Sequence, residues 1–96
     1  MLVDIWAVIN DMPCSLVDIS ISGAHVEVEE AEAPRIGDPV QLRFTLSGSA
    51  HSLPGVVIRA ADDGVVSELG IAFAGLQPDA IDALARAIDD LSAAAG

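Results

Sequence analysis

The feature that most constrains the fold of this sequence is a series of short apolar runs, each ended by turn-forming residues. The clearest run is Val40–Leu46, in which apolar residues occupy every second position and polar residues lie between them. A period of two places all the apolar side chains on one face of an extended strand. This pattern predicts a half-buried β-strand, with Ser47-Gly48-Ser49 as the turn that ends it.

The same criteria predict five further strands and one helix. The expected strands are Leu2–Ile9, Cys14–Ile19, Ala24–Glu29, Val40–Leu46, His51–Ala60 and Val65–Phe73. Turns are expected at Asn10–Pro13, Asp18–Gly23 and Asp62–Gly64, and a loop at Glu30–Pro39. Short consecutive strands joined by turns can protect their edges by closing into a barrel.

The last part of the chain has helical rather than strand periodicity. Pro78 suits the first position of a helix, where its missing N–H is not needed. The predicted apolar stripe consists of Ile81, Leu84, Ala85, Ile88 and Leu91. Residues 92–96 are expected to fray. The prediction is therefore a mostly β fold, a six-stranded antiparallel barrel with one C-terminal α-helix that covers a mouth or groove of the barrel.

A short polar motif, Asp-x-Ser-x-x-Gly, falls between the second and third predicted strands. Asp18 and Ser20 have short side chains that can accept hydrogen bonds from backbone N–H groups one or two residues on. Gly23 permits either a positive φ or a close backbone approach that a side chain would prevent. These are common turn residues, so the motif by itself indicates a sharp corner between two strands.

The order of these parts resembles the PilZ family of small β-barrels that sense cyclic di-GMP. The resemblance covers about residues 13–91 of a single domain, 1–96, and includes Leu69-Gly70-Ile71-Ala72-Phe73, which is similar to the final strand of the family. It implies that Asp18, Ser20 and Gly23 contact a guanine edge of cyclic di-GMP. The family also uses an Arg-x-x-x-Arg motif to hold the phosphates, which would fall at or before Met1. No arginine precedes Arg35 in this sequence, and this argues against tight direct binding.

Composition excludes several other functions. The 15 carboxylates and only four basic side chains, all arginine, give a net charge of −11, so the chain lacks the basic surface that nucleic-acid binding requires. Binding to anionic membranes is disfavoured for the same reason. We expect no membrane insertion and a cytoplasmic location, because no apolar run is long enough to span a bilayer or resembles a signal peptide. Cys14 is the single cysteine, so no internal disulfide can form.

Other candidate sites are weak. Two histidines, His25 and His51, and Cys14 are too scattered for a typical zinc site. The acidic group Glu27, Glu29, Glu30 and Glu32 lacks the calcium-loop pattern. No nucleophile elbow or paired acid–base arrangement indicates an enzyme, and no cofactor is expected.

The remaining conspicuous side chains have ordinary expected roles. Trp6 is expected in the core or as a lid on the barrel, and Phe44 and Phe73 can also be internal. Arg43 and Arg59 are assigned to outward strand positions, and Arg35 to a loop. The sequence cannot place any of these arginines near the Asp18–Gly23 turn.

Two functions are consistent with these observations. By resemblance, the first is a PilZ-type regulatory or adaptor domain of cyclic di-GMP signalling that acts through contacts with another protein or a fused domain. The alternative is a ligand-independent structural or assembly module that dimerises or docks on a larger machine. The sequence does not define the oligomeric state.

Overall fold

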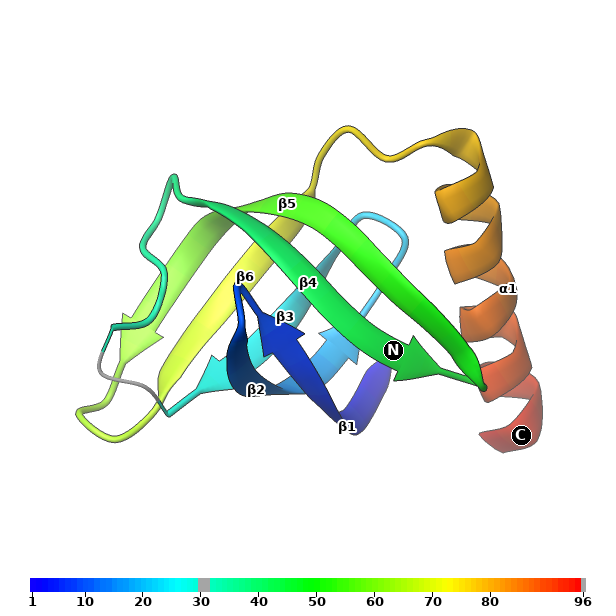
Figure 1. The fold of residues 1–96 in the computed structure, drawn as a ribbon. Helices are drawn as coiled ribbons and strands as arrows, with labels where there is room; N and C mark the ends of the chain where they lie inside the picture. The colour runs from blue at the N-terminus through cyan, green and yellow to red at the C-terminus, as the bar shows by residue number, and fades with distance from the viewer. Residues whose placement is uncertain (30–31, 96) are drawn as a thin grey trace.

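Six antiparallel strands close into a barrel, and one helix lies across an end of it (Figure 1). The computed structural model describes residues 1–29 and 32–95. The elements are β1 (Leu2–Ile9), β2 (Met12–Ile19), β3 (Gly23–Val28), β4 (Pro39–Leu46), β5 (Ser49–Asp62), β6 (Ser67–Phe73) and α1 (Pro78–Ala95). The strand order around the barrel is β1-β2-β3-β6-β5-β4. The predicted fold class is confirmed.

The first hairpin is tighter than predicted. Asn10 and Asp11 form a two-residue connection, with φ values of 47° and 70°. Positive φ at both positions matches the twist of the flanking strands, and Asn and Asp tolerate it better than most residues. As a result β2 begins at Met12, and Pro13 lies inside the strand opposite Val8, not in the turn as predicted.

The β5–β6 hairpin also differs from the prediction. β5 extends from Ser49 to Asp62, and β6 begins only at Ser67, so Val65 belongs to the connection and not to the strand. The Asp63 carboxylate accepts hydrogen bonds from the N–H groups of Val65 and Val66, at 2.9 and 2.8 Å. These bonds hold the pKa of Asp63 below its usual value. They also stabilise the turn between β5, which is longer than predicted, and β6, which is shorter.

The inward side chains of all six strands form one core with two residues of the helix. Its members are Ala7, Ile9, Cys14, Leu16, Ile19, Val26, Val28, Val40, Leu42, Phe44, Leu46, Leu53, Val57, Leu69, Ile71, Leu84 and Ala87. The alternation predicted for β4 is observed, since Val40, Leu42, Phe44 and Leu46 are all buried. Most of the core is aliphatic, and burying such side chains is the main favourable term in folding.

The helix presents a slightly different face from the one predicted. Leu84 and Ala87 are buried, whereas Ile81, which we placed on the stripe, is 38% exposed. The hydroxyl of Ser47, in the β4–β5 turn, donates a 2.9 Å hydrogen bond to the Ala87 carbonyl and brings that turn of the helix onto the barrel. The helix also continues to Ala95, past Ser92, where we expected fraying to begin.

Trp6 is the clearest error of the sequence prediction. Its side chain is 71% exposed and belongs neither to the core nor to a lid. In β1 the buried residues are Ala7 and Ile9, so the even-numbered positions, including Asp4 and Trp6, face outward. By contrast, Phe44 is buried and Phe73 is partly buried against the core.

Candidate functional site

A row of four residues crosses four neighbouring strands on the outside of the barrel. Strand pairing places them side by side in the order Asp18, His25, Gly70 and Arg59. Adjacent positions in such a row lie about 5 Å apart. Strand pairing therefore brings an arginine to the same surface as the Asp18–Gly23 motif, a connection that the sequence alone did not provide.

Two β-bulges turn the charged ends of this row outward. The register shifts between Leu16 and Asp18 in β2, and between Val57 and Arg59 in β5. Leu16 and Val57 are buried, so strict alternation would direct Asp18 and Arg59 into the core as well. An extra residue in each strand reverses the alternation, and bulges often re-aim side chains in this way beside functional sites.

The row forms part of a shallow hollow of about 470 Å³, which we call the turn pocket. Its lining residues are Met1, Asp18, Ile19, Ser20, Ser22, Gly23, Ala24, His25, Ile58, Arg59, Gly70, Ile71 and Ala72. His25 and Gly70 lie between Asp18 and Arg59 in the row, and the small residues Gly23 and Ala72 pair with each other nearer the turn. A surface of this kind lets a flat ring approach the backbone closely.

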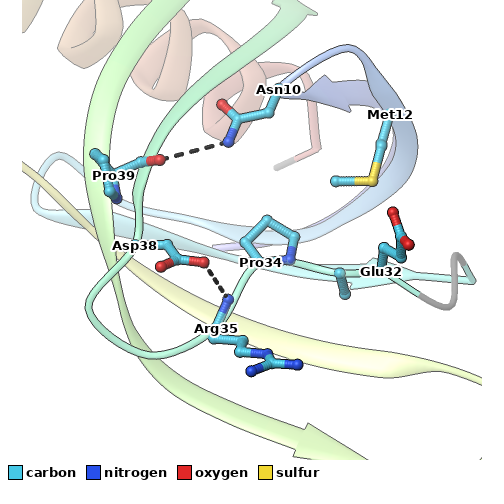
Figure 2. Close-up of a pocket in the computed structure, with 8 residues that line it drawn as sticks. Asn10, Met12, Glu32, Pro34, Arg35, Asp38 and Pro39 are labelled. Atoms are coloured by element: carbon cyan, nitrogen blue, oxygen red, sulfur yellow. Dashed lines mark hydrogen bonds between the residues drawn. The ribbon is translucent and has the colours of Figure 1, made fainter.

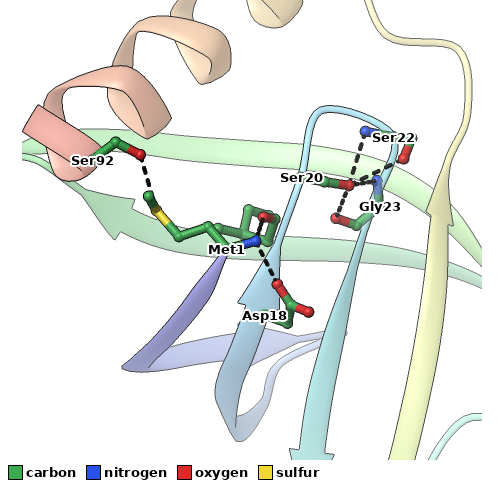
Figure 3. Close-up of polar contacts among 7 residues, drawn as sticks. Met1, Asp18, Ser20, Ser22, Gly23 and Ser92 are labelled. Atoms are coloured by element: carbon green, nitrogen blue, oxygen red, sulfur yellow. Dashed lines mark hydrogen bonds and ion pairs between the residues drawn. The ribbon is translucent and has the colours of Figure 1, made fainter.

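Ser20 holds the turn between β2 and β3. Its hydroxyl oxygen accepts hydrogen bonds from the N–H groups of Ser22 and Gly23, both at 3.3 Å, and contacts the Ser22 hydroxyl at 3.0 Å (Figure 3). The Ser20 N–H also donates to the Gly23 carbonyl at 2.9 Å. The hydrogen-bonding role predicted for Ser20 is confirmed. The turn itself consists of residues 20–22, and Asp18 and Gly23 lie at the ends of the strands.

Asp18 has a different partner from the one predicted. Its Oδ1 accepts a hydrogen bond from the amino group of Met1 at 2.8 Å, and the two groups form an ion pair (Figure 3). That hydrogen bond is the main reason why the pKa of Asp18 is below its usual value. Because of this low pKa the carboxylate is ionised at neutral pH. About half of the side chain is exposed, so it can be reached from the turn pocket.

Gly23 is required by packing and not by a positive φ. A Cβ at this position would collide with the carbonyl oxygen of Ile71 in β6. No side chain fits this space, so Gly23 allows β3 and β6 to pair at the base of the turn. Gly70 is less restricted: its Cβ would lie 3.1 Å from the Cβ of Arg59, on the pocket side.

Only one of the four arginines lines the turn pocket. Arg59 is exposed, and within residues 1–29 and 32–95 no carboxylate lies within ion-pair distance of it. Arg43 forms a 2.9 Å ion pair with Asp11 on another part of the barrel. Arg86 lies on the helix. Arg59 is thus the pocket residue that the sequence could not place beside the Asp18–Gly23 turn.

Arg35 lies in a separate hollow beside the loop before β4. This hollow has a volume of about 490 Å³, and Arg35 N–H donates to Asp38 Oδ2 at 2.9 Å there (Figure 2). At another side of this hollow, the side-chain amide of Asn10 donates a 3.4 Å hydrogen bond to the Pro39 carbonyl. Glu32, also on its rim, directly follows residues 30 and 31, which lie outside the described residues.

The other candidate residues do not assemble into a site. His51 is buried and stacks on Phe44, with ring centroids 5.2 Å apart. Burial lowers the pKa of His51 and raises the pKa of the Cys14 thiol to about 11. Across the described residues, no three His, Cys, Asp or Glu side chains are grouped so that they could hold a metal ion. Of the predicted acidic group, Glu30 falls outside the described residues.

The fold is thus a closed six-stranded barrel with a covering helix and a hollow at the β2–β3 turn. Comparison with protein families identifies its class: the model for the PilZ domain matches residues 8–90, and the chain belongs to this family. PilZ domains are regulatory binding domains of cyclic di-GMP signalling and not enzymes. None of the curated proteins matches the chain. No helix in the described part of the structure is long and apolar enough to cross a membrane.

Proposed function

We propose that this chain is a PilZ-type regulatory domain that passes the cyclic di-GMP signal through contacts with another protein or a fused domain. We further propose that the turn pocket holds the nucleotide, but weakly. The observation that carries this proposal is the row of Asp18, His25, Gly70 and Arg59. It has a carboxylate at one end and, at the other, an arginine without an ion-pair partner among the described residues.

In this proposal the two ends of the row have different tasks. Asp18 exchanges its contact with the Met1 amino group for the ring N–H and the amino group of a guanine, with Ser20 beside it. Arg59 donates to a phosphate oxygen, and its guanidinium is free of competing carboxylates among the described residues. Gly70, between His25 and Arg59 in the row, leaves space for the base.

The weakness of the site follows from charge. One arginine is present where the family motif supplies two, and each charge-assisted hydrogen bond contributes about 1.5–3 kcal/mol. The net charge of −11 also repels a ligand that carries two negative charges. We therefore expect a dissociation constant on the order of tens of micromolar or weaker.

An NMR titration of the ¹⁵N-labelled protein with cyclic di-GMP tests the proposal. Saturable shifts are expected for the amides of Gly23, His25 and Gly70, and Arg59→Gln should weaken binding about tenfold. Arg86→Gln removes the same charge from the helix and should leave binding unchanged. Cyclic di-AMP, which has the same phosphates but no guanine edge, is the ligand control. No saturable shift up to about 1 mM cyclic di-GMP, or equal shifts with cyclic di-AMP, would overturn the assignment of the pocket.

The alternative function, a ligand-independent assembly module, is supported by a separate observation. Several large apolar side chains are exposed, including Leu2 and Trp6 on the outer face of β1. If these residues mediate self-association, light scattering will report a dimer that Trp6→Ala converts to monomer. A monomer at all concentrations tested would argue against this alternative.

A further inference from the structure

The largest exposed apolar side chain of the protein does not line the turn pocket. Trp6 is 71% exposed on β1, in the same outward series as Asp4 and Val8. Tryptophan is among the residues most enriched where protein interfaces gain their binding energy. Exposing this side chain is unfavourable, because the hydrophobic effect favours burying it. Trp6 is not among the residues that form the barrel core.

Trp6 separates two hollows on the barrel surface. One, of about 600 Å³, has mainly apolar walls that include Val8, Phe44 and Ala50. The other, of about 230 Å³, includes Pro13, Ser15, Glu27 and Glu29. We call Trp6 and these two hollows the Trp6 face. It can receive an apolar side chain on one side of the indole and a polar or charged one on the other.

The carboxylates of the Trp6 face lie on one side of the indole, in the hollow that contains Glu27 and Glu29. Strand pairing places Trp6, Ser15, Glu27 and Glu68 in one row across β1, β2, β3 and β6. Glu27 and Glu68 are thus direct cross-strand neighbours of the same charge, which disfavours folding. A protein that keeps such a pair beside an exposed tryptophan gives up stability at this surface, as is common at functional sites.

The cations near this face are already neutralised or absent. None of the four arginines lines the hollow that contains Glu27 and Glu29. Arg43 lines the apolar hollow, but its guanidinium is paired with Asp11 at 2.9 Å. The net charge of −11 extends the negative potential beyond these residues and favours approach of a basic partner.

We propose that the Trp6 face is a docking surface for a basic segment of a partner protein that carries an arginine next to an apolar side chain. The arginine stacks on the exposed indole face and reaches Glu27 and Glu29, and the apolar side chain enters the hollow formed by Val8, Phe44 and Ala50. Stacking of a guanidinium on tryptophan and its pairing with carboxylates are mutually compatible. This inference rests on the proposed function, because it identifies the surface through which the domain makes its protein contacts.

Selection from a random 12-residue peptide library displayed on phage, with the folded protein as bait, tests this proposal although the partner is unidentified. The selected peptides should be enriched in arginine beside leucine or an aromatic residue, and they should bind Trp6→Ala about tenfold more weakly or worse. Ile36→Ala, which truncates another exposed apolar residue, is the matched control and should bind normally. Selection of peptides without basic residues, failure to enrich any peptide, or equal binding to Trp6→Ala would each overturn the proposal.

Trp6 also provides a direct signal for binding at this face. It is the only tryptophan, and the chain contains no tyrosine, so its fluorescence reports on this surface alone. A selected peptide should shift the emission to shorter wavelength as it covers the indole. An unchanged emission spectrum with saturating peptide would place the binding elsewhere and contradict the proposal.

Charge-matched variants test the role of the carboxylates. The double variant Glu27→Gln, Glu29→Gln should weaken peptide binding by about three- to tenfold and reduce its dependence on salt. Asp82→Asn with Asp89→Asn removes the same charge from the helix and should have little effect. Equal loss in both variants would show that only overall charge matters, and that result would overturn the role of Glu27 and Glu29.

Failure of this proposal is distinguishable from failure of the proposed function. If basic peptides require Trp6 but cyclic di-GMP gives no saturable shifts, the docking surface stands without the nucleotide site. If cyclic di-GMP binds at the turn pocket and no peptide depends on Trp6, the regulatory role stands and its protein contacts lie elsewhere.

Discussion

The turn pocket and the Trp6 face lie on the same barrel wall and share strands β2 and β3, but they are built in opposite ways. The turn pocket depends on two missing side chains: Gly23 lets β3 and β6 pair closely at its base, and Gly70 leaves space beside Arg59. The Trp6 face depends on a large side chain that projects from the wall. Gly23 is fixed by backbone packing, whereas the Trp6 side chain forms no part of the core. Substitutions should therefore separate the two regions clearly.

Gly23→Ala is expected to have the largest effect on stability. The new Cβ would collide with the Ile71 carbonyl oxygen, so β3 and β6 must move apart at the base of the turn pocket. We expect the free energy of unfolding to fall by about 2–3 kcal/mol. Trp6→Ala should change it by about 0.5 kcal/mol or less, because the side chain is mostly exposed. Urea denaturation measures both, and equal losses would contradict the contrast between the two regions.

Gly70→Ala should affect stability less but nucleotide binding more. Its Cβ would lie 3.1 Å from the Cβ of Arg59, a tight contact that small shifts of the strands relieve, at a cost of about 1 kcal/mol. The same methyl group fills the space between His25 and Arg59, so cyclic di-GMP binding should be lost. Isothermal calorimetry and thermal unfolding of the same sample separate the two effects. Unchanged nucleotide binding would show that the middle of the turn pocket is not used.

A smaller, pH-dependent effect on stability is expected from His51, which lies beneath the Trp6 face. Burial lowers the pKa of His51 from its usual 6.5, so the native state keeps the ring neutral where the unfolded chain takes up a proton. Stability is therefore unaffected above pH 6.5 and falls as the pH decreases from 6.5 toward the folded-state pKa. His51→Leu should reduce this slope in denaturation curves. A slope that is unchanged in His51→Leu would show that other groups cause it.

Glu27→Gln is expected to have the smallest effect, and of the opposite sign. Removing one charge from the Glu27–Glu68 pair relieves repulsion across β3 and β6, which should stabilise the protein by a few tenths of a kcal/mol. The gain should disappear at high salt. Glu29→Gln, outside the strand pairing of β3, serves as the control. A loss of stability in Glu27→Gln would mean that the carboxylate has a structural role.

The sequence was informative where one face of an element is polar. β4 was predicted well because its outward positions are Gln, Arg and Thr. In β1 both faces are mainly apolar, and the outward position of Trp6 was missed although Asp4, two residues earlier, shares its face. The helix shows the same difficulty. Alanine is frequent on all its sides, so Ile81 was placed on the buried stripe and Ala87 was left off it.

The turn pocket was only half predictable. Asp18, Ser20 and Gly23 are close in sequence, and their turn has a local hydrogen-bond pattern that can be inferred from residue types. Arg59 joins them through the pairing of β3 with β6 and of β6 with β5, and this pairing order is not encoded locally. The outward position predicted for Arg59 is confirmed, but no sequence pattern indicated the bulge that produces it or the pairing that brings Arg59 beside the turn.

The two bulges limit the registers in which β2 and β5 can pair. Val17 and Ile58 are their extra residues. If either strand kept its extra residue but paired without a bulge, Asp18 or Arg59 would point into an aliphatic core with no counter-ion, which is costly. Deleting Val17 or Ile58 would instead place Asp18 directly after Leu16, or Arg59 directly after Val57, so that strict alternation would still direct the charged side chain outward. The strands can thus lose the extra residue without burying a charge, whereas a slip in pairing that keeps it would bury one.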